Sequence, residues 1–370
     1  MDRLSSRQVV MLGCLMTLNA TLASIPSQMV EAAKQDAIFA YPLALAAVIF
    51  SWWVISRVMK RFPNRDLYAV LVERFPYLGR MIGAGYILFF FVISMRDYHQ
   101  LGSFINYSLL PRTPIIILLL ILAVCSAWVA RPGVVIIARM TEIYQTFLVI
   151  VILMLPLLLV REFQLRNVQP IWEYGGVPVL KASWYAVAYI GELIGLAFLS
   201  KNESFPFRQG MYGLLWGVGL LQLLIFLCIG VLNPELTSRF IYPNHHLIRE
   251  IRITDFLDRF DVFIVGIWIP AMMVKTCVNL YLVTNGITRL LPRASGSSLT
   301  LSIAVLASVG AITFFPDYMQ LLEFNKTWPL IALFFEMILP LSFLIWLKPA
   351  KGSHAVKEEA ASPRTPSPNV

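Results

Sequence analysis

The stretch VAYIGELIGLAF, residues 187–198, places one carboxylate, Glu192, between Gly191 and Gly195 in an otherwise apolar run. A charged side chain at the centre of a membrane helix costs roughly 2.5–3.5 kcal/mol on insertion scales. A glycine inside a helix costs about 1 kcal/mol relative to alanine. The pattern therefore predicts a helix that is interrupted near Glu192, where the carboxylate and the free backbone groups serve a function. The alternative is a small-residue seam for close helix packing, but a packing face has no need of a carboxylate.

The composition predicts a membrane protein around this stretch. The 370 residues are 58% hydrophobic and 14% charged, whereas soluble domains are about 45–50% apolar and about 25% charged. A water-soluble core cannot hide this much apolar surface, so we expect a polytopic helical protein whose outer faces contact membrane lipid. The net charge of +9 does not indicate a nucleic-acid partner, because the basic residues gather in short loops between apolar runs.

The sequence carries none of the motifs of common enzymes and metal sites. It has no HExxH, GxSxG, GxGxxG or Walker pattern, and its four cysteines lie in apolar segments without a CxxC. We therefore expect no enzyme activity, no cofactor, no metal and no ATP-driven pumping. The cysteines are expected to be buried free thiols.

Ten apolar runs are long enough to span a bilayer, which takes about 20 residues each. The sixth is the interrupted run that contains Glu192. The predicted spans are 8–30, 38–59, 79–109, 113–130, 134–160, 183–200, 210–232, 261–290, 298–315 and 327–347.

The basic residues of the first half predict the orientation. If the N-terminus is cytoplasmic, ten of them face inside and two, Lys34 and Arg112, face outside. Cytoplasmic loops carry an excess of Lys and Arg, and ten crossings then return the C-terminus to the cytoplasm. The ten inside positions are Arg3, Arg7, Arg57, Lys60, Arg61, Arg65, Arg74, Arg80, Arg131 and Arg139.

The chain is predicted to form one transmembrane domain over residues 1–347, followed by a disordered cytoplasmic tail over 348–370, which is rich in Pro, Ser and charge. The outer segment 233–260 is expected to form two short surface helices, the second capped by Thr254 and Asp255, with His245 and His246 solvated. A cleavable signal peptide is the alternative for the N-terminus, because Arg3 and Arg7 precede a short apolar run.

The first and sixth spans are both interrupted, and they occupy corresponding positions in two sets of five. The first span carries Asn19, Thr21 and Ser24, followed by Pro26, which cannot extend a helical hydrogen-bond ladder. Interrupted segments at corresponding positions of two halves indicate a transporter-type binding site. Positive half-helix ends attract an anionic group and free carbonyls attract a cation, so facing breaks suit a zwitterion.

Two further spans carry polar groups at membrane depth. In the third span, Arg96 and Gln100 lie one turn apart and Asp97, Tyr98 and His99 flank them; an interhelical hydrogen-bond seam is the alternative reading. In the eighth, Lys275 and Thr276 lie in an apolar run together with Asn279. A lone lysine there needs a partner, and we expect Glu192 to supply it. The tenth span contains Glu336, for which the sequence suggests no partner.

The chain resembles the B subunits of spore germinant receptors, the endospore germination permeases of the amino acid–polyamine–organocation superfamily. The resemblance covers residues 4 to about 347, in family order. Its residues are LSSRQVVMLG at the N-terminus, IPSQMVEAAKQDAIFAYP at 25–42, LLPRTP at 109–114, VQPIWEYGGVPVLKAS at 168–183, GELIGLAFL at 191–199 and ITDFLDRFDVFIVGIWI at 253–269.

The resemblance implies an all-α fold with a five-plus-five inverted repeat of the leucine-transporter type, in which helices 1 and 6 are unwound at the centre. It also implies a location in the spore inner membrane, a germinant as ligand, commonly an amino acid, and A-type and C-type receptor subunits as partners.

We therefore expect the ligand to bind between the two breaks. Backbone N–H groups near residues 19–24 and 190–195 would hold its carboxylate, and Glu192 or exposed carbonyls would hold its ammonium group. Tyr98, Gln100 and Thr276 would shape the side-chain pocket. The expected binding residues are Asn19, Ala20, Thr21, Ser24, Tyr98, Gln100, Gly191, Glu192, Gly195, Lys275 and Thr276.

Two other functions fit the same sequence. One is a proton-coupled amino acid transporter, with Asp97 and Glu192 relaying the proton and Lys275 standing in for a sodium ion between helices 1 and 8. The other is a structural subunit with an empty, degenerate site. Uptake into proteoliposomes and ligand titration distinguish these functions from a sensor.

Overall fold

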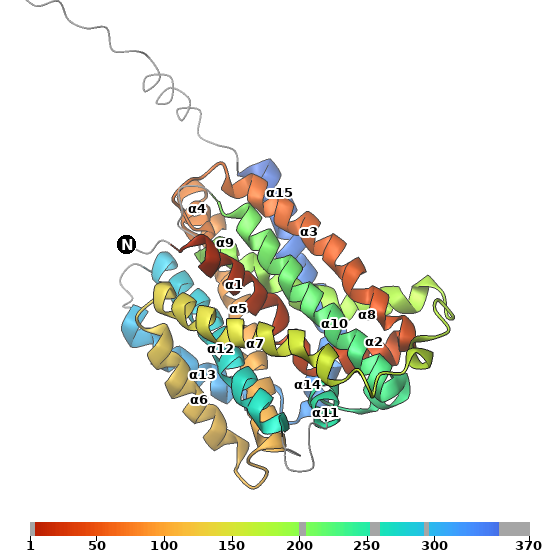
Figure 1. Ribbon diagram of the computed structural model, residues 1–370. Helices are drawn as coiled ribbons and strands as arrows, with labels where there is room; N and C mark the ends of the chain where they lie inside the picture. Colours follow the sequence, from red (N-terminus) through yellow and green to blue (C-terminus); the bar gives the residue numbers. More distant parts are fainter. Residues whose placement is uncertain (1–3, 200–204, 252–259, 292–295, 348–370) are drawn as a thin grey trace, which may run out of the picture.

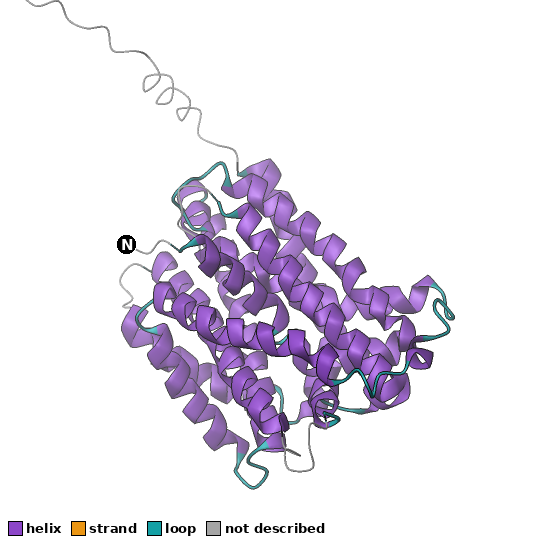
Figure 2. Ribbon diagram, viewed as in Figure 1, coloured by secondary structure: helices purple, strands orange, loops and turns teal. Residues whose placement is uncertain are grey.

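The computed structural model describes residues 4–199, 205–251, 260–291 and 296–347. Every regular element in these ranges is helical (Figure 2). Within the described part of the chain, seven helical runs are long and apolar enough to cross a membrane. Three shorter apolar helices, Ser6–Leu18, Ile115–Ala130 and Leu299–Phe314, accompany them. The helices pack as one bundle, with the start of α1 and the end of α15 at the same end, here called the terminal face (Figure 1).

The predicted helical spans are confirmed, because each overlaps at least one helix of the structure. The longer helices are α1 (Ser6–Leu18), α2 (Thr21–Ala33), α3 (Ala40–Met59), α5 (Leu78–Ser108), α6 (Ile115–Ala130), α7 (Val134–Leu158), α8 (Gly176–Ile190), α10 (Phe207–Arg239), α12 (Phe260–Leu290), α13 (Gly296–Phe314) and α14 (Tyr318–Leu333). The shorter elements are η1 (Lys34–Phe39), α4 (Leu67–Arg74), η2 (Leu165–Val168), η3 (Gly191–Gly195), α9 (Leu196–Leu199), α11 (Pro243–Arg249), η4 (Phe334–Ile338) and α15 (Leu339–Trp346).

The first predicted interruption is present, and it is shallower than an unwound segment. It consists of Asn19 and Ala20 between α1 and α2, and both residues keep right-handed helical dihedral angles. Side chains satisfy the carbonyls next to it: the Thr21 hydroxyl donates to Thr17 O at 2.7 Å, and Gln100 Nε2 donates to Ala20 O at 3.0 Å. These hydrogen bonds satisfy carbonyl groups at the junction of α1 and α2, so the backbone there does not need to unwind into an extended segment.

Pro26 does not form the break; it lies inside α2. A proline has no N–H for the carbonyl four residues earlier, which here is Leu22 O. The side chain of Asn244, in α11, replaces that donor, with Nδ2 at 2.5 Å from Leu22 O. The proline therefore ties α2 to the short helix that covers it.

The second predicted interruption is the 3₁₀ helix η3, which separates α8 from α9. Its glycines lie where neighbouring helices approach closely. A Cβ at Gly195 would overlap the Met16 side chain of α1 and lie 3.0 Å from Leu282 Cδ1 of α12. The glycines therefore allow the sixth span to pack directly against the first and eighth spans. This agrees with both sequence interpretations, a helix interruption and a small-residue seam for close helix packing.

A glycine seam fixes α1 against α10. A Cβ at Gly213 would lie 2.5 Å from Val10 O and 2.9 Å from Gly13 Cα, so only glycine fits there. The Gly13 Cα is within van der Waals reach of the opposite helix backbone for the same reason. This seam holds the first half of the interrupted span in position.

The outer connections differ in part from the expectation. α11 is one of the two predicted short helices, whereas Thr254, Asp255 and the tail 348–370 lie outside the described residues. The expectation that His245 is solvated is wrong: its side chain is buried, and its ring packs edge-on against Phe104 at 5.5 Å. α10 extends to Arg239 with a kink at Asn233, whose φ is 66° ahead of Pro234.

Candidate functional site

Four charged side chains meet in the core at the level of η3. Lys275 Nζ lies 2.6 Å from Asp97 Oδ2 and 2.7 Å from Glu192 Oε2. Arg96 Nη2 lies 2.8 Å from Asp97 Oδ1 and also donates to Glu192 Oε1. Asn279 Nδ2 completes the group at 2.9 Å from Asp97 Oδ2. The expected pairing of Lys275 with Glu192 is confirmed.

We call Arg96, Asp97, Glu192 and Lys275 the charge cluster. All four side chains are at most 1% exposed. Two cations face two carboxylates, so their formal charges cancel, and each carboxylate contacts both cations. This balance explains how four charges persist in an apolar core, because a single unpaired charge there costs several kcal/mol. The cluster joins three elements, α5, η3 and α12.

Tyr189 extends the polar network from the charge cluster toward α2. The Arg96 guanidinium lies 4.0 Å from the centre of the Tyr189 ring, a cation–π contact. The Tyr189 hydroxyl donates to Asn325 Oδ1 at 2.7 Å, and Asn325 Nδ2 donates to Gln28 Oε1 at 3.1 Å. Tyr189 was not among the predicted site residues; its position next to the Gly191–Glu192 break is the sequence signal for it.

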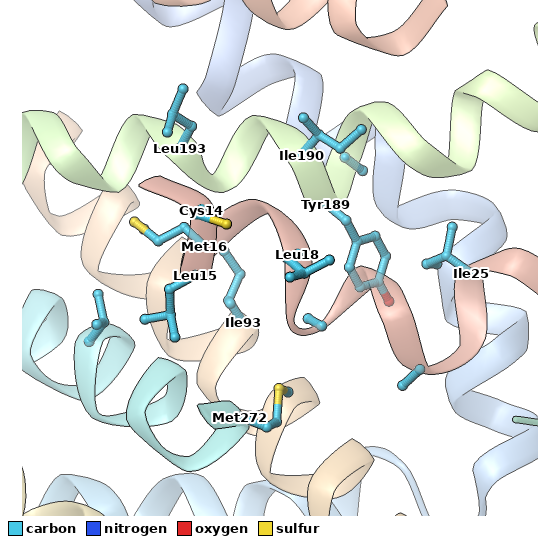
Figure 3. Packing of buried hydrophobic residues seen from close by; sticks show 14 of the residues in the cluster. Cys14, Leu15, Met16, Leu18, Ile25, Ile93, Tyr189, Ile190, Leu193 and Met272 are labelled. Carbon is cyan, nitrogen blue, oxygen red and sulfur yellow. The ribbon is translucent and has the colours of Figure 1, made fainter. Parts of the chain in front are cut away.

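Asn19 is the polar side chain of the first break that the structure leaves available. It is fully buried, and neither its Nδ2 nor its Oδ1 has a hydrogen-bond partner among the described residues. In most proteins the N–H and C=O groups of a buried side-chain amide have hydrogen-bond partners. Figure 3 shows the apolar side chains around this break, with Leu18 on one side of it and Tyr189 projecting from α8 toward it.

Some of the predicted residues face other neighbours. The Tyr98 hydroxyl hydrogen-bonds Ser126 of α6, because two residues along a helix place Tyr98 nearly opposite Gln100. The Thr276 hydroxyl donates to Met273 O of its own helix at 2.7 Å. Ser24 lies in the first turns of α2.

The structure therefore assembles part of the predicted set at the breaks. Gln100 is joined by a hydrogen bond to Ala20, the neighbour of Asn19 in the chain, and Glu192 and Lys275 are joined by their ion pair. Arg96 and Asp97, which complete the charge cluster, were noticed in the sequence as polar groups at membrane depth but were not assigned to the site.

A small apolar cavity with a volume of about 40 Å³ lies on the α11 side of the first break. Leu22 and Ala23 of α2 form part of its wall, one turn beyond Asn19. Phe104, Trp268 and the α11 residue His245 close it. Among the described residues, no group of three or more His, Cys, Asp or Glu side chains could hold a metal ion.

Comparison with known proteins identifies the family. Residues 3–318 match the family of spore germination proteins. The chain belongs to the spore germination protein family. It is 35% identical to YfkT of Bacillus subtilis (strain 168) over 351 residues, which cover 94% of this chain and 97% of YfkT.

The chain is also similar to spore germination protein KB of Bacillus subtilis (strain 168). The identity is 26% over 372 residues, covering 96% of this chain and 99% of KB. The germinant-receptor resemblance predicted from the sequence is therefore confirmed at the level of the family. The family relationship and the apolar helices make the chain an integral membrane protein.

Solved transporters share the fold of this family member. The transporter Mhp1, of the nucleobase-cation-symport-1 family, matches with a TM-score of 0.59 and 12% identity, covering 94% of this chain and 93% of Mhp1. A Na⁺-coupled sialic acid symporter matches with a TM-score of 0.61 and 11% identity, covering 91% and 80%. The predicted leucine-transporter-type fold is confirmed, and the two helix breaks are the elements that this fold places at its centre.

Proposed function

We propose that this chain is the germinant-binding membrane subunit of a spore germination receptor, and that it senses a small nutrient, an amino acid, between its two helix breaks. The observation that carries the proposal is Asn19. A fully buried amide with two unpartnered polar atoms, at the break of the first span, is explained by a ligand that supplies the missing hydrogen bonds.

The polar end of the ligand is proposed to lie at the start of α2. Ala20, which precedes this helix, provides no capping side chain, so the carboxylate is assigned to the first N–H groups of α2 and to the Asn19 side-chain amide. The backbone N–H groups of Asn19 and Ala23 already donate to Leu15 O and Ala20 O. The ammonium group is assigned to exposed carbonyls near residues 190–195 in preference to Glu192, because Arg96 and Lys275 already contact both oxygens of Glu192.

The apolar end of the ligand is proposed to extend toward the α11 side. The cavity there begins one turn beyond Asn19 at Leu22 and Ala23, and its wall includes Leu148 and Trp268. A hydrophobic lining with few polar groups suits an aliphatic or aromatic side chain. This placement favours an apolar amino acid over a sugar.

The charge cluster is proposed to transmit binding rather than to bind the nutrient. It connects α5, η3 and α12, so a shift of η3 changes contacts in all three elements. A ligand that prefers one arrangement of the repeats shifts the population toward it. A-type and C-type receptor subunits, in the spore inner membrane, would read that shift, with both termini of this chain in the cytoplasm.

The decisive experiment is a thermal-shift screen of the purified full-length protein with the twenty common amino acids. A ligand that binds only the folded form raises the melting temperature, by mass action. The expected result is an increase with one or more apolar amino acids that disappears in Asn19→Leu.

Asn285→Leu is the matched control. Asn285, also an amide in the bundle with an unpartnered Nδ2, lies on α12 nearly three turns from Lys275. This variant is expected to keep the ligand-induced shift. An unchanged shift in Asn19→Leu would show that the nutrient binds elsewhere.

Proton-coupled amino acid transport remains the second candidate, favoured by the fold shared with two solute symporters. Uptake of labelled amino acid into proteoliposomes tests it. Net accumulation under a proton gradient supports transport, whereas saturable binding without accumulation supports sensing. Asp97 and Glu192 are both occupied by cations, so a proton carrier is better sought elsewhere.

A further inference from the structure

Glu336 is a buried carboxyl group that the proposed site does not use. Its side chain is in the tenth span, 2% exposed, and neither Oε1 nor Oε2 has a hydrogen-bond partner among the described residues. An isolated charge in such a place costs several kcal/mol, whereas a neutral carboxyl group costs far less.

The backbone around Glu336 forms an irregular helical turn that neighbouring side chains stabilise by hydrogen bonds. Residues Phe334–Ile338 form a π-helical turn, η4, a feature found frequently at functional sites. Pro340 lies four residues after Glu336 and has no N–H to donate to Glu336 O. The Ser51 hydroxyl of α3 donates to that carbonyl instead, and the Tyr86 hydroxyl of α5 donates to Phe335 O at 2.7 Å.

The carboxyl group points at the break of the sixth span. A Cβ on Gly191 would overlap Glu336 Oε2 and would lie 2.6 Å from its Cδ, so the carboxyl packs directly on the first residue of η3. Gly191 and Ser51 also line a crevice between α3 and η3 with a volume of about 10 Å³, which is roughly the room that one water molecule needs. Glu336 does not itself line this crevice, so water in it would meet the carboxyl only if η3 moved.

The charged and titratable groups on the neighbouring elements are already engaged. On η3, Glu192 contacts Arg96 and Lys275; on α5, Arg96 contacts Asp97 and Glu192, and Tyr86 donates to a backbone carbonyl. The charge cluster is neutral as a whole. Arg96 Nη1 has no hydrogen-bond partner among the described residues, but the charge of this guanidinium is already matched by Asp97 and Glu192, so no described cation is paired with Glu336.

We propose that Glu336 is a proton-binding site whose occupancy is linked to the break of the sixth span. In the conformation described here the carboxyl carries its proton and packs against Gly191. When η3 moves and water enters the crevice, the O–H bond breaks, the proton passes to water and the electron pair stays on the carboxylate. The link to nutrient sensing rests on the proposed function, whereas the proton site does not.

Infrared difference spectroscopy of the purified full-length protein in detergent micelles tests the proton site. The expected result at neutral pH is a C=O absorption of a protonated carboxyl group that shifts in D₂O and is lost in Glu336→Gln. An ordinary glutamate titrates near pH 4.3 and gives no such band at neutral pH. Because no nutrient is added, the test is independent of the proposed function.

Glu323→Gln is the matched control, since Glu323 is an exposed carboxylate on α14 paired with Lys326, and it is expected to leave the band unchanged. Glu336→Ala provides a second deletion of the carboxyl if Glu336→Gln does not fold. A band that persists in the folded deletion variant, or a wild-type protein without one, overturns the proton site.

Gly191→Ala tests the link to the break, because the added methyl group must displace the carboxyl. The expected result is a shifted or lost band. An unchanged band in folded Gly191→Ala would show that Glu336 is not coupled to η3, even if it is protonated.

Discussion

The charge cluster makes a quantitative prediction for the pair Lys275 and Glu192. With all four side chains present the formal charge is zero. Lys275→Met leaves two carboxylates and one cation, a net charge of −1, and Glu192→Gln leaves +1. Breaking a buried ion pair by removing one partner costs about 3–5 kcal/mol, because the remaining charge is uncompensated.

The double variant is expected to be far less destabilised than the sum of the single losses. It retains Arg96 and Asp97, which are 2.8 Å apart and neutral together. Additive losses would total about 6–10 kcal/mol. We expect the double variant to fall short of that sum by about 3 kcal/mol, the upper end for residues in direct contact.

Reversible unfolding in mixed micelles, followed by tryptophan fluorescence, measures these free energies. Lys326→Met and Glu323→Gln provide the control pair, because both side chains are more than half exposed and their ion pair, at 2.6 Å, is screened by solvent. No measurable coupling is expected there. Additivity within about 0.5 kcal/mol for Lys275 and Glu192 would refute the view that they form one balanced cluster.

Two further predictions concern packing and pH. Gly213→Ala is expected to cost about 1–3 kcal/mol of unfolding free energy, because its methyl group meets the α1 backbone, whereas Gly219→Ala on the same helix meets open space and is expected to be neutral or stabilising; equal effects would contradict the seam. Partial burial, with a smaller contribution from Arg249, lowers the pKa of His246. Its stabilising contribution is therefore present above about pH 6.5 and lost as pH falls through the lowered pKa. The wild-type melting temperature should drop more over this range than that of His246→Phe, and parallel curves would contradict this.

The sequence was sufficient to predict the helical spans, the two breaks and the Lys275–Glu192 pair. Charged and glycine residues stand out against an apolar run, and their costs in lipid are large enough to demand an explanation. The same argument could have placed Arg96 and Asp97 in the site, because a charge that needs a partner in one helix implies an opposite charge in another.

Other features depended on contacts between distant segments. The sequence could not predict that Asn19 and Ala20 keep helical dihedral angles at the first break, because the hydrogen bond to Ala20 O comes from Gln100, 80 residues away. Pro340 is visible in the sequence, but the donor that replaces its N–H is Ser51, on α3. The position of Tyr98 opposite Gln100 could have been read from helical periodicity, whereas its partner Ser126 could not.

The charge cluster also bears on how the chain is made. Arg96 and Asp97 are adjacent in sequence and can enter the bilayer as a neutral pair. Glu192 is synthesised next, and its balancing lysine follows 83 residues later. Until α12 has been translated, the nascent protein holds a surplus negative charge that hydrocarbon disfavours. The third and sixth spans therefore reach their final packing only after the eighth span has been inserted. Biogenesis of this protein thus depends on its C-terminal part.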